Sequence, residues 1–404
     1  MVILGTWQQK PVTISIKPNC LTVSIEAAGA TDVFSYDFAG RLWTALFQGV
    51  SYRRGLDGKM IAKWSEPQGR RRGWLAPPEA RQIETQARQL VAELFADWRQ
   101  GNVPTNQALS PEAVAGFERA LAFDSQRSQA DAEQYHQVYK PVGILPPDQY
   151  MAVVLQATEG CAFNTCTFCD FYKDRPFRIK SPSEFLEHAH AVRDYLGPGL
   201  SLRRTIFLGD ANALVAPMAK LSPLMDIVHQ VYDVERLGGI YAFLDGFSGQ
   251  KKTRADYADL ARRGLKRVYI GMESGNAELL SFLRKPGQPQ DALQAVRALK
   301  AGGVAVGVIV LLGAGGRQYA RRHVADTIAL LNAMPLDLED VVYFSELILS
   351  EGMHYVQDAY AAELQPLDEA ARQAQAEEIE AGLRFSEQGG VPHISRYDIR
   401  EFVY

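Results

Sequence analysis

The stretch "MAVVLQATEGCAFNTCTFC" (residues 151–169) joins an apolar run to three cysteines. The run at 151–157 is short and uncharged, which predicts a strand that is buried on both faces. Cys161, Cys166 and Cys169 follow it with the spacing C-x4-C-x2-C. The sequence therefore places a thiol-rich loop at the carboxyl end of a buried strand, which is where parallel α/β folds place their chemistry.

The same pattern continues along the chain. Five more apolar runs alternate with segments whose apolar residues repeat at helical spacing. The runs lie at 205–210, 239–245, 267–272, 304–313 and 340–348, and the helical segments at 182–196, 221–231, 254–263, 290–301 and 322–331. Strands that alternate with helices indicate βα units and a parallel sheet. We therefore expect an α/β core over residues 150–350, a partial (β/α)6 TIM-like barrel, with a doubly wound sheet as the alternative.

Residues 1–149 have a different character. Between residues 12 and 48, runs of alternating polar and apolar residues are separated by turn signals, which predicts an antiparallel meander. Residues 55–75 are rich in turn residues, and we expect a long loop there. Two helices and then a polar connector are expected at 78–98, 111–122 and 124–147. This amino-terminal region is therefore predicted as a β-rich α+β region with a capping or substrate-binding role.

The last region, residues 351–404, is predicted as a short extension that closes the barrel. It contains an acidic segment at 368–385, which we expect to be helical, and it ends in "GGVPHISRYDIREFVY".

Length and composition limit the classes of protein. A chain of 404 residues is long for one core, so two or three domains are expected. A net charge of -4 disfavours a general polyanion binder, so we expect no nucleic-acid partner. The most apolar run, 304–313, is shorter than the ~20 residues that a membrane helix needs, and the start lacks a signal peptide. We therefore expect a cytoplasmic protein with reduced thiols and no membrane association.

The cysteine loop predicts a metal centre. Three thiolates can hold three corners of a [4Fe–4S] cluster and leave the fourth iron open. A structural zinc site normally takes four protein ligands. The fourth cysteine, Cys20, is distant in sequence and is expected to be an ordinary buried thiol. A non-catalytic metal module, either a zinc-stabilised binding protein or an iron–sulfur redox sensor, is the alternative.

The loop resembles that of the radical SAM superfamily, in which the commonest spacing is C-x3-C-x2-C. The wording "CTFC-x-x-YK-x-x-x-FR" resembles a branch of iron–sulfur oxidoreductases with the longer first gap. The resemblance covers roughly residues 150–349. It implies a [4Fe–4S] cluster held by Cys161, Cys166 and Cys169, with S-adenosylmethionine (SAM) on the open iron.

The resemblance also implies an activity and partners. The reduced cluster would cleave SAM to a 5′-deoxyadenosyl radical, which takes a hydrogen atom from an unidentified organic substrate. A small metabolite or lipid is preferred over a peptide or a tRNA base. A low-potential electron donor such as flavodoxin or ferredoxin would supply the electron.

Four candidate SAM contacts lie near the first two strands. Phe168, just before the third cysteine, stands where the superfamily often places an aromatic ring against the adenine. Gly209, Asp210 and Asn212 belong to "GDAN", which ends the second strand. That motif stands where the superfamily receives the methionine amino group, and a carboxylate such as Asp210 is a natural acceptor for an ammonium.

Four further candidates follow from the same resemblance. "GMESG" (271–275) closes the fourth strand, and Glu273 and Ser274 within it are expected to bind the ribose or the carboxylate. Lys173 and Arg178 form part of a cationic run after the cysteines, and one of them is expected to meet the methionine carboxylate or an anionic substrate. No residue is assigned to a catalytic step on the substrate.

Overall fold

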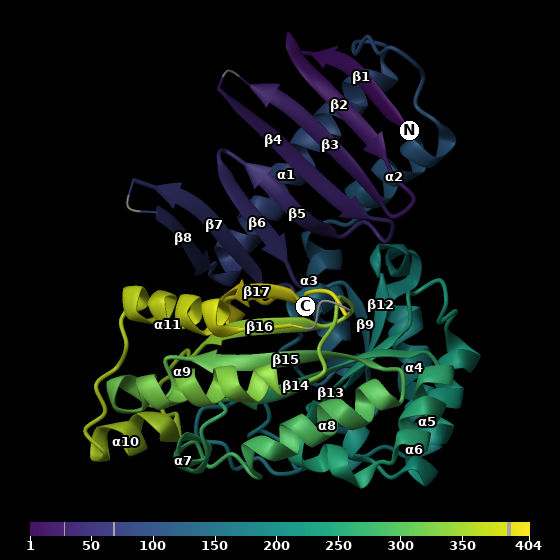
Figure 1. Ribbon diagram of the computed structural model, residues 1–404. Coiled ribbons are helices and arrows are strands. Elements are labelled where there is room, and N and C mark those ends of the chain that lie inside the picture. Colours follow the sequence, from purple (N-terminus) through teal and green to yellow (C-terminus); the bar gives the residue numbers. More distant parts are fainter. Residues whose placement is uncertain (28, 68, 386–388) are drawn as a thin grey trace. The chain divides into compact units, whose positions relative to one another are not determined.

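The computed structural model describes residues 1–27, 29–67, 69–385 and 389–404 (Figure 1). The chain divides into two compact units. The first comprises residues 1–141, 190–204 and 403–404, and the second comprises residues 142–189 and 205–402. The division at 141/142 lies close to the domain boundary expected at 149/150. Residues 190–204 join the first unit although they lie within the βα region of the sequence.

The first unit is built on an eight-stranded antiparallel sheet whose strands follow their order in the sequence. The strands are β1 (Val2–Trp7), β2 (Lys10–Ile16), β3 (Cys20–Ala27), β4 (Ala30–Asp37), β5 (Leu42–Phe47), β6 (Val50–Arg54), β7 (Met60–Glu66) and β8 (Gly69–Trp74). The predicted meander is confirmed and extends at both ends. The long loop expected at 55–75 is wrong, because β7 and β8 form a hairpin there. Charged residues on an edge strand, such as Arg72 opposite Lys63, hide the apolar alternation.

Three helices belong to the first unit: α1 (Pro77–Arg99), α2 (Pro111–Ala122) and α3 (Ser125–Val138). The connector expected at 124–147 is wrong, because α3 lies within it. This helix is polar, so its apolar pattern is weak, but Asp124 caps it by accepting a hydrogen bond of 2.9 Å from the Arg127 amide.

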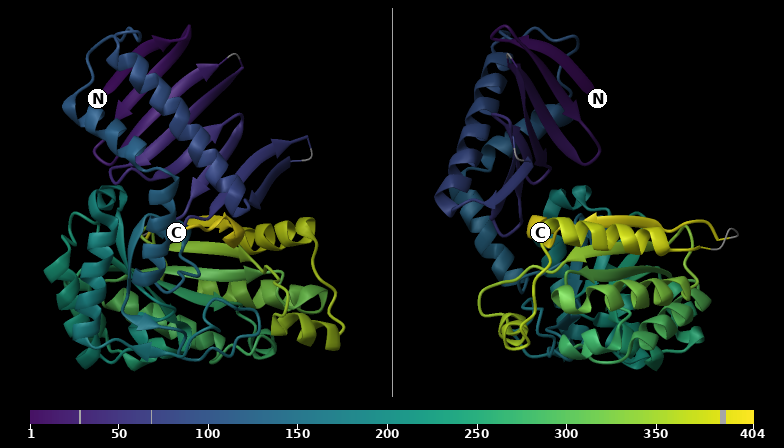
Figure 2. Two further views of the ribbon diagram at one scale, coloured as in Figure 1. Left: turned by 180° about the vertical axis from the view of Figure 1, so that it is seen from behind. Right: turned by 60° about the vertical axis from the view of Figure 1, so that its left-hand side comes forward.

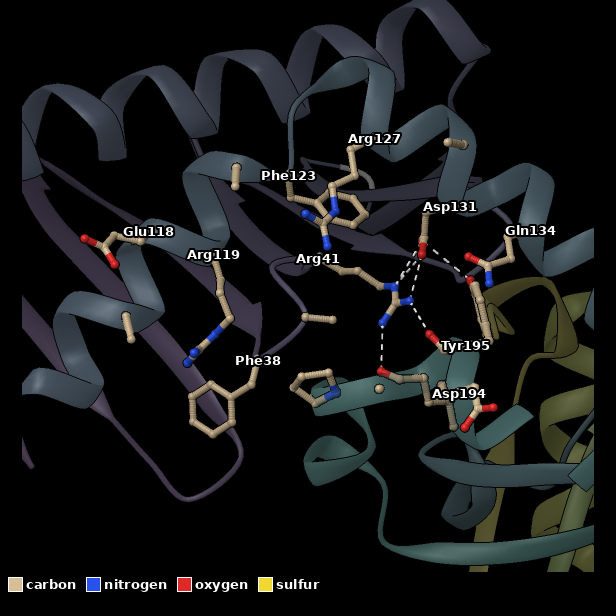
Figure 3. Close-up of a pocket in the computed structure, with 17 residues that line it drawn as sticks. Phe38, Arg41, Glu118, Arg119, Phe123, Arg127, Asp131, Gln134, Asp194 and Tyr195 are labelled. Atoms are coloured by element: carbon tan, nitrogen blue, oxygen red, sulfur yellow. Dashed lines mark hydrogen bonds and ion pairs between the residues drawn. The ribbon is translucent and has the colours of Figure 1, made fainter. Parts of the chain in front are cut away.

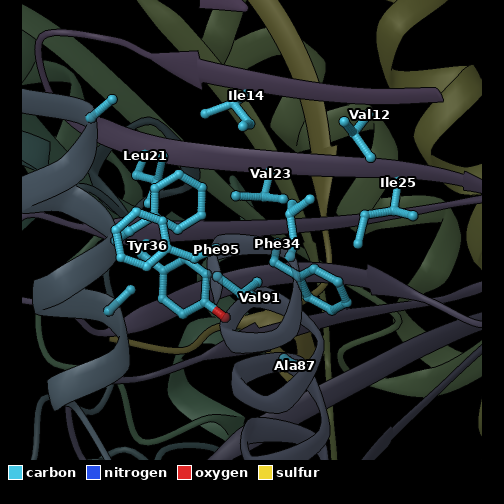
Figure 4. Close-up of a cluster of buried hydrophobic side chains, with 14 of the residues drawn as sticks. Val12, Ile14, Leu21, Val23, Ile25, Phe34, Tyr36, Ala87, Val91 and Phe95 are labelled. Atoms are coloured by element: carbon cyan, nitrogen blue, oxygen red, sulfur yellow. The ribbon is translucent and has the colours of Figure 1, made fainter. Parts of the chain in front are cut away.

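One face of the eight-stranded sheet packs against α1, which lies behind the sheet in Figure 1 and in front of it in the reversed view of Figure 2. Alternate strand residues such as Val23 and Phe34 meet Val91 and Phe95 of α1 in this core (Figure 4). Val23, Phe34 and Val91 have no exposed surface. Every second side chain of the strands therefore packs against one apolar face of α1, and together they form a single apolar layer.

The second unit is built on a seven-stranded sheet in which all neighbours are parallel. In order across the sheet, the strands are β17 (His393–Tyr397), β16 (Val341–Glu346), β15 (Ala305–Leu312), β14 (Leu265–Glu273), β13 (Ile240–Asp245), β12 (Thr205–Gly209) and β9 (Ala152–Gln156). The six predicted strands are confirmed. Their order never reverses, which confirms the partial TIM-like barrel and rejects the doubly wound sheet. The carboxyl-terminal extension adds β17, a seventh strand.

Helices α4 (Pro182–Leu196), α5 (Met218–Val231), α6 (Arg254–Arg262), α7 (Ala277–Phe282), α8 (Pro289–Ala301), α9 (Gly316–Asn332), α10 (His354–Ala361) and α11 (Glu369–Gly382) follow the strands. Glu184 and Ser181 form a capping box at α4, with N–H···O distances of 3.3 and 2.7 Å. No helix among the described residues is long and apolar enough to cross a membrane.

Candidate active site

The cysteine loop leaves the carboxyl end of β9 and is closed at its base by two short strands. β10 (Thr158–Glu159) pairs antiparallel with β11 (Arg178–Ile179), so the loop returns to its starting point. Cys161, Cys166 and Cys169 lie in the loop as free, half-buried thiols. Burial raises the pKa of Cys169 to about 12 and also raises that of Cys166. These thiols need a positive partner to become thiolates.

The three cysteines line a cavity of about 470 Å³ within the second unit. Polar side chains reach it from the ends of neighbouring strands. The lining also has many aromatic side chains: Phe163, Phe168, Phe171, Tyr172, Phe243, Phe247 and Tyr397. The cavity has the size and the mainly apolar wall of a small-molecule site.

Glu273 and Lys285 form an ion pair in this cavity. Lys285 Nζ donates to Glu273 Oε1 at 3.0 Å, and both side chains are nearly buried. Glu273 ends β14 where the pairing with β15 shifts register, and its φ of 61° lies in the left-handed region. Such a bulge redirects a side chain. Burial opposes the charge on Lys285, but Glu273, Cys166 and Asp245 together outweigh it and raise the pKa of the lysine.

Asn212 and Asp245 form a second polar pair in the same cavity. Asn212 Nδ2 donates to Asp245 Oδ2, and Asp245 Oδ1 accepts from the Ser248 amide at 2.7 Å. Burial raises the pKa of Asp245. Asn212 Oδ1 is buried and accepts no hydrogen bond from the part of the chain that the structure describes. An unsatisfied acceptor at a cavity wall is suited to a ligand donor.

Among the predicted contacts, Phe168, Asn212 and Glu273 line the cavity with the cysteines, whereas Gly209 and Asp210 do not. Asp210 instead supports the base of the cysteine loop. Its carboxylate accepts from the Gly160 amide at 3.2 Å and lies 3.4 Å from Arg175. Burial raises the pKa of Asp210 to about 6.

Ser274 also lies outside the cavity lining. It has no exposed surface, and its Oγ lies 2.7 Å from Nδ1 of His323 on α9. The serine thereby ties the end of β14 to a helix.

The two predicted cations, Lys173 and Arg178, are exposed and are not among the lining residues. Arg178 is bound to Glu159 at 2.8 Å and to Glu184 at 2.7 Å. Lys173 donates to the Cys166 carbonyl oxygen at 3.3 Å. In the structure these side chains hold the loop together.

The described lining holds two cations, and the sequence singled out neither of them. Arg400 is bound to Asp398, and Lys285 lies near Cys166. Lys285 lies after α7 in "LRKPG", away from every strand end. The Pro-Gly turn that follows Lys285 is the local sequence feature that could have drawn attention to it, because such a turn fixes the direction of the chain after the helix.

The residues present suit an iron–sulfur cluster and a zwitterionic ligand. Within the described ranges, no three His, Cys, Asp or Glu side chains are grouped to hold one metal ion. A cluster bonds each thiolate to a separate iron, so its ligands need not converge on one point. Three free thiols around one cavity meet that requirement. Lys285 supplies a nearby positive charge, and Asn212 supplies an open acceptor.

Comparison with protein families matches residues 155–331 to the Radical SAM superfamily. One similar solved structure is the cobalamin-dependent SAM radical enzyme OxsB, with 14% identity, 70% of this chain and 36% of that chain covered, and a TM-score of 0.39. A second is SuiB of Streptococcus suis, with 11% identity, 87% of this chain and 72% of that chain covered, and a TM-score of 0.41. A third is the coproporphyrinogen III oxidase HemN of Escherichia coli, with 13% identity, 55% of this chain and 50% of that chain covered, and a TM-score of 0.43. The aligned part thus spans about a third of the length of OxsB. No curated protein matches the chain.

Proposed function

The chain belongs to the radical SAM superfamily through residues 155–331, and from this premise we propose that it abstracts a hydrogen atom from a small organic metabolite or a lipid. It is an enzyme of the radical SAM class, and the enzymes of this superfamily use a [4Fe–4S] cluster and SAM. The observation that carries the proposal is that three free thiols and two polar pairs line one cavity.

The three cysteines would hold the cluster. When bound, the cluster and SAM supply a one-electron cleavage of the sulfonium and a hydrogen-abstracting adenosyl radical. Cys161, Cys166 and Cys169 come from one loop closed by β10 and β11, so their spacing is held by backbone pairing. A low-potential donor such as flavodoxin or ferredoxin would supply the electron that reduces the cluster. The cytoplasm would keep the three thiols reduced.

The Glu273–Lys285 pair suits the methionine end of SAM. That end carries an ammonium and a carboxylate on the same carbon, so an anion and a cation side by side suit it. Glu273 and Lys285 present both, 3.0 Å apart, at the cavity wall. Ion pairs with hydrogen bonds are the stronger kind of polar contact. In this proposal Lys285 replaces Lys173 and Arg178 as the partner of the carboxylate.

Asn212, Asp245 and Phe168 suit the adenosine end. Ribose hydroxyls donate hydrogen bonds, and the open Oδ1 of Asn212 and the carboxylate of Asp245 are acceptors. The Phe168 ring, which also lines the cavity, would pack against the adenine.

The remaining wall favours an apolar substrate. Its apolar members come from β15, β17, the residues after β16 and the residue before α10, and include Ile309, Leu311, Leu347, Met353 and Tyr397. Glu346, Ser350 and Arg400 are polar members of the same wall. An apolar wall excludes water, which protects a reactive radical from side reactions. This lining favours a small metabolite or a lipid over a tRNA base, whose phosphates would require more cations.

Transfer of deuterium tests the substrate class. Anaerobic, cluster-loaded enzyme with reductant and SAM is offered perdeuterated extracts of metabolites, of lipids and of digested peptides. We expect deuterium in 5′-deoxyadenosine with a metabolite or lipid extract, and none with Cys166→Ala. Deuterium from the peptide digest alone, or none while SAM is still cleaved, would overturn the substrate assignment.

A further inference from the structure

A second cavity, of about 530 Å³, lies within the first unit (Figure 3). Four chain segments line it: the turn after β4, α2 with the residue that follows it, α3, and residues 194–198, which include the end of α4. None of these residues belongs to the cysteine-lined cavity. A concave site of this size is the kind that holds a small molecule.

Arg41 fixes one wall and has no capacity left for a ligand. It donates to Asp131 at 2.7 to 3.0 Å and to the carbonyl oxygens of Tyr195 and Leu196 at 2.8 and 3.3 Å. The side chain is buried, and its guanidinium lies over the Tyr195 ring. This network holds α3 and residues 194–198 in place, so the cavity is built before any ligand arrives.

Arg119, on α2, differs from Arg41. Its guanidinium carbon lies 5.4 Å from the centroid of the Phe38 ring. Its Nε is buried and finds no acceptor in the described chain. Neither do the described residues offer its guanidinium an ion pair, so a buried donor at the cavity wall has no acceptor from the protein.

Arg127, on α3, also lies over an aromatic ring, but its side chain is exposed at the rim of the cavity. Its guanidinium carbon lies 5.8 Å from the Phe123 centroid, and no carboxylate among the described residues pairs with it. Three acids also line the cavity. Asp131 is bound to Arg41, and Asp194 pairs with Arg193 at 3.0 Å. Glu118 lies at the edge of Figure 3, apart from Arg127 and Phe123.

We propose that this cavity binds an organic anion whose carboxylate or phosphate meets Arg119 and Arg127 and whose body packs on Phe38 and Phe123. Both groups are recognised by the fork of N–H donors that arginine presents. The rings on which the arginines stack provide apolar surface, and Ala115, Ala122 and Ala130 extend it. The site is independent of the proposed radical chemistry and gives the amino-terminal unit a ligand-binding role.

Calorimetric titration of the anaerobic, cluster-loaded full chain tests the site. The probes are phenyl phosphate and phenylacetate, with benzyl alcohol as the uncharged match. Two variants, Arg119→Gln and Arg127→Gln, remove one fork each. Arg99→Gln is the control, because Arg99 also lies over a ring, Phe95 at 5.8 Å, but outside the cavity.

We expect saturable binding of at least one anion and much weaker binding of the alcohol. Each cavity variant should weaken the anion about tenfold, whereas Arg99→Gln should not. The better of the two anions identifies the ligand group as phosphate or carboxylate. Binding of neither anion at millimolar concentration, equal binding of the alcohol, or equal loss in Arg99→Gln would overturn the proposal. Arg119→Lys keeps the charge without the fork, so partial binding by that folded variant separates recognition from misfolding.

Discussion

Lys285 donates a 3.0 Å hydrogen bond to Glu273 inside the cavity that contains three free thiols. The two residues are twelve positions apart, and the helix between them turns the lysine back towards the end of β14. A paired cation and anion at the carboxyl edge of the sheet is the feature that most narrows the kind of ligand the cavity accepts.

Replacing Lys285 by Met should weaken SAM binding by at least tenfold. The change removes the partner proposed for the methionine carboxylate and leaves Glu273 buried without its cation. Equilibrium dialysis of SAM against anaerobic, cluster-loaded protein measures the effect. Iron content is measured in parallel and SAM affinity is given per loaded cluster, because Lys285 is also the cation near Cys166.

Lys300→Met provides the matched control for that variant. Lys300 is also a paired lysine, 2.7 Å from Asp337 and from Asp340, but it lies on α8 and does not line the cavity. Its loss should lower stability without changing SAM affinity. Unchanged affinity in Lys285→Met would reject the role proposed for the ion pair.

Asn212→Ala should lower SAM affinity about tenfold, the equivalent of one or two lost hydrogen bonds. The variant removes the open Oδ1 acceptor and also the donor to Asp245. Competition binding with 5′-deoxyadenosine separates the two ends of SAM. If Asn212 contacts the adenosine end, then 5′-deoxyadenosine affinity falls as well. An affinity for 5′-deoxyadenosine equal to that of the wild type would place Asn212 elsewhere.

His323 should make the fold acid-sensitive. Burial lowers its pKa from about 6.5 to about 4, so the folded state stays neutral where the unfolded state binds a proton. The free energy of unfolding is therefore unaffected by the titration of His323 above pH 6.5, and it decreases as the pH falls from 6.5 towards 4. The full effect amounts to about 3 kcal/mol.

Chemical denaturation of the wild type and of His323→Gln at pH 7 and pH 4.5 measures that contribution. The free energy of unfolding should fall by about 2 kcal/mol less in the variant. Parallel losses in the two proteins would show that His323 is already free to protonate in the folded state.

Arg41→Met should destabilise the first unit by about 3 to 5 kcal/mol, because it leaves Asp131 buried without its bidentate partner. The double variant with Asp131→Leu should recover part of this loss, since the unpaired Asp131 carboxylate is gone. The recovery stays partial because Asp37 has also lost its contact with Arg41. Thermal unfolding of the wild type, of the two single variants and of the double variant tests the pair. Additive losses from the two changes would mean that the ion pair contributes no coupling.

The sequence predicted the parallel sheet because strands buried on both faces are continuous apolar runs. β17 escaped prediction because it lies at the sheet edge and none of its residues is buried. The β7–β8 hairpin and α3 were missed for a similar reason, as their exposed faces are polar and dilute the periodicity. Edge and surface elements depend on tertiary contacts that a local pattern does not contain.

The candidate site divides in the same way. The three cysteines were predictable because their spacing within one loop is local. Asn212 and Glu273 follow from the rule that strand ends meet at one edge of a parallel sheet. Lys285 reaches the cavity through a helix and a turn, so only the folded chain brings it to Glu273.

Anaerobic reconstitution followed by a SAM cleavage assay tests the central claim most directly. The full chain should bind about four irons and form 5′-deoxyadenosine from SAM under strong reductant. Cys161→Ala, Cys166→Ala and Cys169→Ala should each lose both properties. Cys20→Ala, which removes a buried thiol of the first unit, should retain them. Bound zinc in place of iron, or a cluster that never cleaves SAM, would contradict the account.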